Sequence, residues 1–278
     1  MNVSSAEYAR DLGRALVGAV LFALPLFMTM EMWWLGFTAD RMRLAALLIV
    51  TLPMLVALSY FAGFERAFGI VDHVLDAFAA IAIAAVAGAI VLLLLGVFSP
   101  GQPLDEIVGK IAAVTFPAGI GALLADKQLG REQHVEDKDR RLQRSYFARL
   151  FLMTIGALFV ALNVAPTEEM ILIAFQLSPW QSLALALVSL AALHALLFWT
   201  ELPGNGDWRG EAGFFSVLIR FTCAGYALCA LASLFLLWTF GRTDHVSLAE
   251  LTEFVVVLSF PAVLGAGLAH RVVVEQRD

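Results

Sequence analysis

Charged side chains are scarce in this sequence: Asp, Glu, Lys and Arg together make up 15% of the 278 residues. Soluble globular domains carry about 25% charged residues, and the hydrophobic share here is 60%. No basic stripe indicates a nucleic-acid partner. This composition excludes an ordinary soluble domain and predicts a protein whose main partner is the lipid bilayer.

Cysteine and catalytic motifs are also scarce. The two cysteines, Cys223 and Cys229, lie six residues apart in one apolar run, a spacing that suits neither a redox pair nor a metal site. We interpret them as small packing residues. The sequence has no phosphate-binding loop, no GxSxG elbow, no HExxH and no paired histidines for haem. It gives no positive support for an enzyme and predicts no cofactor.

Long apolar runs dominate what remains. Several reach about 20 residues, the length with which a helix crosses the hydrocarbon core of a membrane. The alternating pattern of barrel strands is absent, so the spans are expected to be helices. The sequence therefore predicts an all-α polytopic membrane protein with eight transmembrane helices, at 13–36, 43–62, 74–98, 107–125, 150–174, 181–200, 214–240 and 251–270.

The distribution of Lys and Arg predicts the orientation. With the amino terminus inside, only Arg41, Arg43, Lys110 and Arg242 of the 18 basic residues fall on the outer side. Because basic residues concentrate in cytoplasmic loops, both termini and the polar stretch between the fourth and fifth spans are expected to be cytoplasmic. The expected location is the inner (cytoplasmic) membrane.

Two segments recur in the same order along the chain. Residues 18–32 align without gaps on 156–170, where Thr-x-Glu-Met repeats, and 116–125 align on 260–269, where Phe-Pro-Ala-x-x-Gly-Ala repeats. Because each expected unit has four helices, both copies enter the membrane from the same side and are parallel. The predicted organisation is a first four-helix repeat at 1–126, a charged cytoplasmic linker at 127–149 and a second four-helix repeat at 150–278.

Four carboxylates are expected near the outer ends of these spans, two of them in the first repeated segment and two at the starts of the fourth and eighth spans. Ionisable residues within spans usually face the bundle interior or a water-filled cavity. Carboxylate oxygens bind hard cations, and a close pair of carboxylates can share a proton. The candidate cation-binding residues are Glu31, Glu169, Glu106, Glu250, Thr29 and Thr167.

Proline predicts a helix break beside the first pair of carboxylates. Pro25 precedes Glu31 and Pro166 precedes Glu169. Each proline removes a helical hydrogen bond and can free backbone carbonyls. Discontinuous helices of this kind form ion sites in transporters.

Structural interpretations of the same carboxylates stay open. Glu31 can reach headgroup water beside Trp33 and Trp34, which are typical of the aromatic belt of a membrane protein. Glu106 and Glu250 can complement the dipole at a helix amino terminus.

Two further groups of polar residues are also interpreted as structural. Asp72, His73 and Asp76 fall at the start of the third span, where helix capping explains the acids. His194 has no second His or Cys at ligand spacing, which favours a packing role.

With its duplicated Thr-x-Glu-Met and Phe-Pro-Ala-x-x-Gly-Ala segments, the chain resembles, over nearly its full length, a bacterial family of uncharacterised integral membrane proteins classed as a domain of unknown function. The resemblance brings no activity and no site residues. Two functions stay open: a transporter or channel for a small cation or proton, and a non-transporting scaffold or sensor that acts through the linker. Gly and Ala faces could also pack chains into a homo-oligomer.

Overall fold

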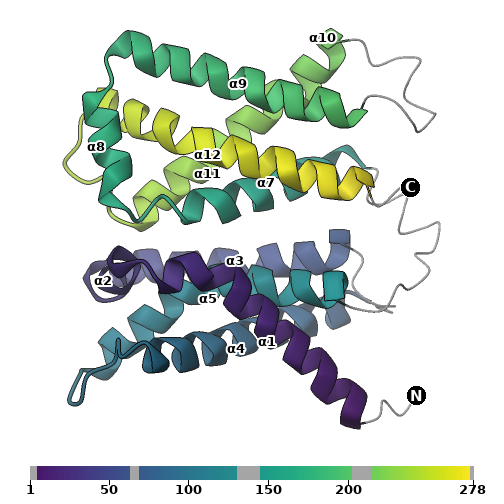
Figure 1. Ribbon diagram of the computed structural model, residues 1–278, viewed down its shortest axis with the longest axis vertical. Helices are drawn as coiled ribbons and strands as arrows, with labels where there is room; N and C mark the ends of the chain where they lie inside the picture. The colour runs from purple at the N-terminus through teal and green to yellow at the C-terminus, as the bar shows by residue number, and fades with distance from the viewer. Residues whose placement is uncertain (1–4, 63–68, 130–144, 202–213, 276–278) are drawn as a thin grey trace. The chain divides into compact units, whose positions relative to one another are not determined.

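The computed structural model describes residues 5–62, 69–129, 145–201 and 214–275, and every regular element in these ranges is a helix (Figure 1). The predicted all-helical class is confirmed. The chain divides into two compact units, Met1–Arg140 and Arg141–Asp278, and each unit is described by itself.

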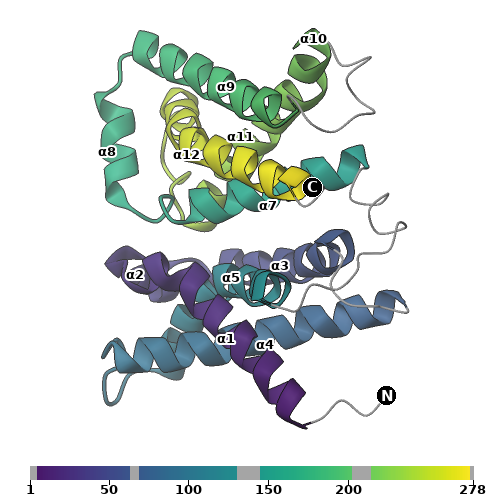
Figure 2. The ribbon, with the colours of Figure 1, turned by 45° about the vertical axis from the view of Figure 1, so that its right-hand side comes forward.

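The first unit is organised around its last helix. It contains α1 (Ser5–Phe27), the short α2 (Met30–Thr38), α3 (Arg41–Ala62), α4 (Ile70–Leu94) and α5 (Leu104–Leu129). Figure 2 shows α5 among the other helices of the unit, and it packs against all four of them. Its apolar span is 72% buried, the largest share among the candidate spans. A helix this enclosed needs small and apolar side chains on every face, as residues 111–124 provide.

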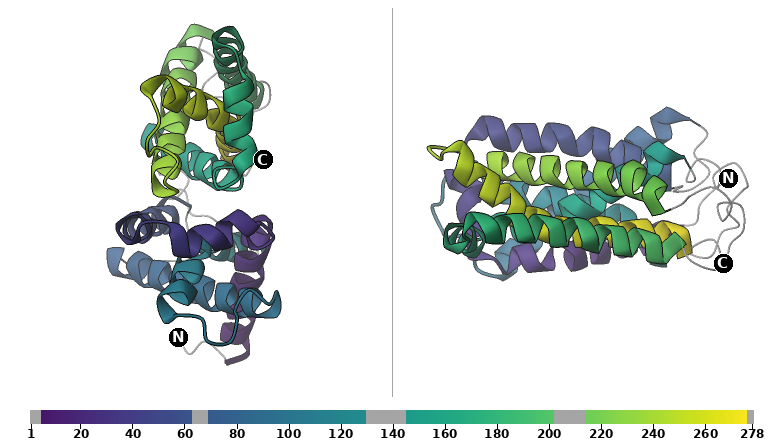
Figure 3. Two further views of the ribbon diagram at one scale, coloured as in Figure 1. Left: turned by 90° about the vertical axis from the view of Figure 1, so that its left-hand side faces the viewer. Right: turned by 90° about the horizontal axis from the view of Figure 1, so that it is seen from above.

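The second unit follows the same order of long and short helices. It contains α7 (Tyr146–Leu162), the short α8 (Glu168–Gln176), α9 (Pro179–Glu201), α10 (Phe214–Val217), the π-helical η1 (Leu218–Cys223), α11 (Ala224–Thr239) and α12 (Leu248–Glu275). Helices α10, η1 and α11 form one continuous helical stretch (Figure 3). The last helix again lies at the centre, because α12 packs against α7, α8, α9 and α11.

The expected eight spans are not confirmed. In the described parts of the chain, six helices are long and apolar enough to cross a membrane, and α1 with α2 adds a seventh if that pair is one span. The span expected at 13–36 is divided between α1 and α2, and the axis bends by 89° between them. The span expected at 150–174 is also divided, because α7 has 17 residues and ends at Leu162, and α8 begins at Glu168.

Glycine permits backbone contact where the first helix of each unit crosses the last. A Cβ atom built on Gly121 of α5 would lie 2.5 Å from the carbonyl oxygen of Gly18 in α1. A Cβ atom built on Gly265 of α12 would lie 2.1 Å from the carbonyl oxygen of Gly156 in α7. Close approach of this kind strengthens van der Waals packing, which supplies much of helix association in a membrane.

Candidate functional site

The break in the first unit lies between Phe27 and Met30. Pro25 lacks a backbone N–H, and α1 ends two residues later, at Phe27; the amide of Thr29 then donates to the carbonyl of Leu26 at 3.2 Å. Thr29 then adopts an extended conformation as the N-cap of α2. The break expected before Glu31 is present, and it makes Glu31 the second residue of a nine-residue helix.

The second unit has a break at the corresponding place. Asn163 stands where the first unit has Pro25, and its side-chain amide donates to the carbonyl of Phe159 at 2.7 Å, at the end of α7. Thr167 is the extended N-cap of α8, so Glu169 is again the second residue of a nine-residue helix. The break expected before Glu169 is therefore also present.

A side-chain hydrogen bond to a backbone carbonyl stabilises each break. In the first unit the indole N–H of Trp33 donates to the carbonyl of Phe27 at 2.9 Å. In the second unit the guanidinium of Arg242, from the loop before α12, donates to the carbonyl of Pro166 at 2.7 Å. These donors satisfy carbonyls that the interrupted helices leave without helical partners.

Among the four predicted carboxylate ligands, Glu31 and Glu169 have the fewest polar contacts with the rest of the protein. Glu31 is half-buried and Glu169 is exposed, and no ion pair among the described residues involves either one. Each lies in the first turn of its helix, where a negative side chain complements the helix dipole.

The predicted threonine ligands are both engaged locally. The hydroxyl of Thr29 donates to the carbonyl of Pro25 at 2.7 Å, and that of Thr167 donates to the carbonyl of Val164 at 2.8 Å. A hydroxyl that donates its hydrogen keeps its oxygen lone pairs, so each oxygen can still face a cation.

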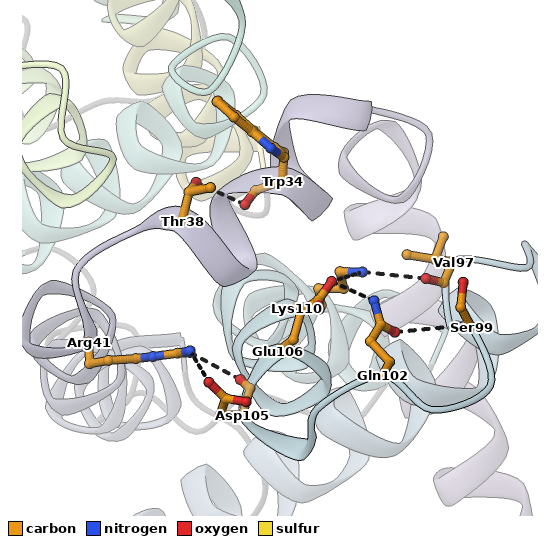
Figure 4. Close-up of polar contacts among 9 residues, drawn as sticks. All are labelled: Trp34, Thr38, Arg41, Val97, Ser99, Gln102, Asp105, Glu106 and Lys110. Carbon is orange, nitrogen blue, oxygen red and sulfur yellow. Dashed lines mark hydrogen bonds and ion pairs between the residues drawn. The ribbon is translucent and has the colours of Figure 1, made fainter.

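Glu106 has a cationic partner within the protein. The ammonium of Lys110 lies 2.9 Å from its carboxylate and 3.4 Å from the carbonyl of Val97 (Figure 4). The same ammonium lies 5.5 Å from the ring centre of Phe37. The side chain of Lys110 is only 6% exposed, and the amide of Gln102 also donates to Glu106. Sequence analysis missed this pair, although a Glu followed four residues later by Lys on one helix is its ordinary signal.

The short helix α2 lies directly on this ion pair. A Cβ atom on Gly36 would lie 2.5 Å from Cα of Lys110, and one on Gly109 would overlap the carbonyl oxygen of Gly36. Arg41, the first residue of α3, adds a second attachment, because its guanidinium lies 2.6 Å from the carboxylate of Asp105 in α5 (Figure 4). The glycine contacts place α2 on the first turns of α5, and this ion pair joins the start of α3 to the same turns.

Glu250 is part of a capping box. The backbone amide of Ser247 donates to its carboxylate at 2.6 Å, and its own amide donates to the hydroxyl of Ser247 at 3.2 Å. This geometry agrees with the capping interpretation of the sequence for Glu250.

The six predicted ligands are divided between the two units: Glu31, Thr29 and Glu106 belong to the first, and Glu169, Thr167 and Glu250 to the second. A single site built from all four carboxylates therefore stays a prediction. No group of three or more His, Cys, Asp or Glu side chains suited to a metal ion occurs in the described ranges.

Residues 11–274 match the model of the family DUF2391, described as "Putative integral membrane protein". The chain belongs to the DUF2391 family. The match covers both units, so the expected family is confirmed and the protein is a multi-pass integral membrane protein. No curated protein and no solved structure matches this DUF2391 chain.

Proposed function

We propose that this DUF2391 protein moves a small cation or a proton across the inner membrane, with Glu31 and Glu169 as the ion-binding carboxylates. The observation that carries the proposal is the interrupted helix in each unit, with a carboxylate at the second position of the segment that follows the break. Interrupted helices place backbone carbonyls and charged helix ends at one point within a membrane. There the carbonyls can replace the water that surrounds an ion.

The proposal includes duplication of a four-helix unit, with both termini inside and the two copies parallel. Each interrupted helix then counts as one crossing segment, which gives eight. The paired glycines support the duplication. The sequence alignment sets Gly18 on Gly156 and Gly121 on Gly265; in the structure, Gly18 meets Gly121 at the close crossing of the first unit and Gly156 meets Gly265 at that of the second. Chance resemblance between apolar helices does not reproduce a contact at both aligned positions.

The six candidate ligands take different roles under this proposal. Glu31 and Glu169 supply charge, and the oxygens of Thr29 and Thr167 supply neutral ligands beside them. Glu106 is compensated by Lys110 and Glu250 is held by its cap, so these two carboxylates position the starts of α5 and α12. Neither has to leave an existing partner for Glu31 or Glu169 to bind a cation.

The test compares wild type with the double variant Glu31→Gln/Glu169→Gln. Purified protein is heated in detergent with Na⁺, Mg²⁺ or Ca²⁺ and at several pH values, because a ligand that binds the native state raises its apparent stability. The same proteins are then reconstituted into vesicles and ion flux is measured. We expect an ion-specific stabilisation and a flux in wild type, both lost in the double variant.

Glu168→Gln is the matched control, because Glu168 is also exposed and lies one position before Glu169 in the same helical turn. It should keep both the stabilisation and the flux. Equal flux in wild type and the double variant would remove Glu31 and Glu169 from the mechanism. No flux in either protein would instead favour the scaffold or sensor. Its predicted surface, the 127–149 linker, lies mostly outside the described residues, and replacing it by a neutral sequence of equal length tests it.

A further inference from the structure

A buried polar cluster joins the end of α3 to the start of α4 in the first unit. Ser59 on α3 is fully buried, His73 on α4 is 9% exposed and Asp76 is half-buried. The hydroxyl oxygen of Ser59 lies 2.9 Å from Nδ1 of His73 and donates to a carboxylate oxygen of Asp76 at 3.1 Å. The capping interpretation of Asp76 is wrong, since this residue lies beyond the first turn of α4 and accepts from a side chain of another helix.

The hydrogen count fixes the direction of both contacts. Ser59 has one hydroxyl hydrogen, and it is directed to Asp76. The contact with His73 therefore requires a hydrogen on Nδ1 that is donated to the hydroxyl oxygen; this tautomer follows from the network rather than from observed hydrogens. The result is a chain of two hydrogen bonds that begins at an imidazole and ends at a carboxylate.

We propose that Ser59, His73 and Asp76 form a binding site for one proton. A proton that arrives at Nε2 of His73 forms an N–H bond there. The Nδ1 hydrogen moves to the oxygen of Ser59, and the hydroxyl hydrogen moves to the carboxylate of Asp76. Both hydrogen bonds re-form in the opposite direction, so the protonated site loses none of its contacts.

The gain is a neutral cluster within a membrane span. Before uptake, neutral His73 and ionised Asp76 leave one negative charge between two apolar helices, and afterwards all three groups are neutral. Uptake of one proton removes this charge, and the chain of hydrogen bonds ends at the carboxylate that carries it.

Few charged side chains surround the cluster among the residues whose side chains the structure describes. The helices packed against α4 are α1, α3 and α5. Arg14 and Asp11 of α1 pair with each other at 3.0 Å, and α5 carries no charged side chain from 111 to 124. Among the side chains that the structure describes, the titratable or charged groups of these elements near this end, besides the cluster itself, are Arg10, Asp11, Arg14, Tyr60 and Asp72; the sequence also places Asp126 and Lys127 in the last turns of α5.

The second unit supplies a natural comparison. Nδ1 of His194 on α9 also lies 2.9 Å from a buried hydroxyl, that of Thr222 in η1. That hydroxyl donates onward to the backbone carbonyl of Val217 at 3.4 Å, and a carbonyl does not take up the proton. His194 also packs against the rings of Phe198 and Phe214. The same imidazole–hydroxyl contact is therefore a packing contact in one unit and ends at a carboxylate in the other.

The experiment is infrared difference spectroscopy of the protein in lipid vesicles between about pH 9 and pH 5, the range in which histidine changes charge. We expect a carbonyl band of a protonated carboxylic acid that disappears in Asp76→Asn. In Ser59→Ala the band should move to higher frequency, because the acid loses its acceptor. His194→Gln is the control and should leave the band unchanged. Identical difference spectra for wild type and Asp76→Asn would overturn the proposal.

A second readout separates proton transfer from simple protonation of the imidazole. In protein labelled with ¹⁵N-histidine, the signal that His73→Gln removes should show hydrogen on Nδ1 at alkaline pH and on Nε2 alone at acid pH. Hydrogen on both nitrogens at acid pH would overturn the transfer to Asp76. Elution of each variant as wild type from a sizing column checks folding. The inference is independent of the proposed function, since both readouts are spectroscopic and require no flux.

Discussion

Replacing Gly121 by Ala tests the helix crossing in the first unit. The added Cβ would lie 2.5 Å from the carbonyl oxygen of Gly18 and 2.5 Å from Cβ of Phe22, and neither atom is the end of a flexible side chain. Ordinary contact needs about 3.5 Å, so α1 and α5 must separate by roughly 1 Å. Overpacking of this kind costs about 1–3 kcal/mol, against which Ala gains up to about 1 kcal/mol in helix propensity.

Gly13→Ala is the matched control, because Gly13 lies on the same α1 helix and a Cβ there meets nothing within 4 Å. Unfolding in mixed micelles, followed by circular dichroism, should place Gly121→Ala about 2 kcal/mol below Gly13→Ala in the free energy of unfolding. Gly265→Ala should be at least as damaging as Gly121→Ala, since its Cβ would lie 2.1 Å from a carbonyl oxygen. If Gly121→Ala proves as stable as Gly13→Ala, the close crossing is not how these helices pack.

The remaining predictions concern the ion pair, the cap and the first break. Glu106→Gln should destabilise the protein by about 2–4 kcal/mol more than Lys110→Met does, because it leaves a buried ammonium without a counter-charge. The double variant should lose less free energy of unfolding than the two single variants lose together. Additive losses in the same micelle assay would refute the pairing. Ser247→Ala should cost about 1 kcal/mol through loss of the cap, whereas no loss would deny that the capping box is stabilising. Trp33→Phe removes the donor to the first break and should cost about 1 kcal/mol, measured in the same way; an unchanged free energy of unfolding would show that the break does not depend on this bond.

The sequence predicts helices well because a membrane span needs a long apolar run, and it predicts both breaks because Pro25 and Pro166 interrupt hydrogen bonding. It does not predict the 89° bend. The bend depends on where α2 packs, and that is decided by the backbone contact between Gly36 and Gly109, residues 73 positions apart in the chain. Contacts between distant residues leave no local pattern that fixes an angle.

The candidate site was predictable only in part, for a related reason. Thr-x-Glu at each break was visible as a repeat, but Lys110 was counted as an outer-side charge although it is buried against Glu106. Ser59 is uncharged and belongs to no motif, so nothing in the sequence marks it. Its role depends on the register between α3 and α4, which brings its hydroxyl to His73 and Asp76.

Under the proposed duplication, the short helix meets the central helix at corresponding positions in both units, but the contacting side chains differ. Phe37 corresponds to Phe175, and Lys110 corresponds to Phe254. In the first unit the ammonium of Lys110 lies 5.5 Å from the ring centre of Phe37, and in the second the rings of Phe175 and Phe254 meet edge to face at 5.4 Å.

This exchange explains why the corresponding carboxylates Glu106 and Glu250 have different partners. With Lys110 present, Glu106 is needed to balance a buried charge; with Phe254 in its place, Glu250 has no cation to balance and caps its own helix instead. At the corresponding contact the second unit therefore holds its short helix by apolar packing, whereas the first depends on a charge balance. An ion that competed for Glu106 would weaken the attachment of α2 to α5, and no such effect can reach α8 through Glu250.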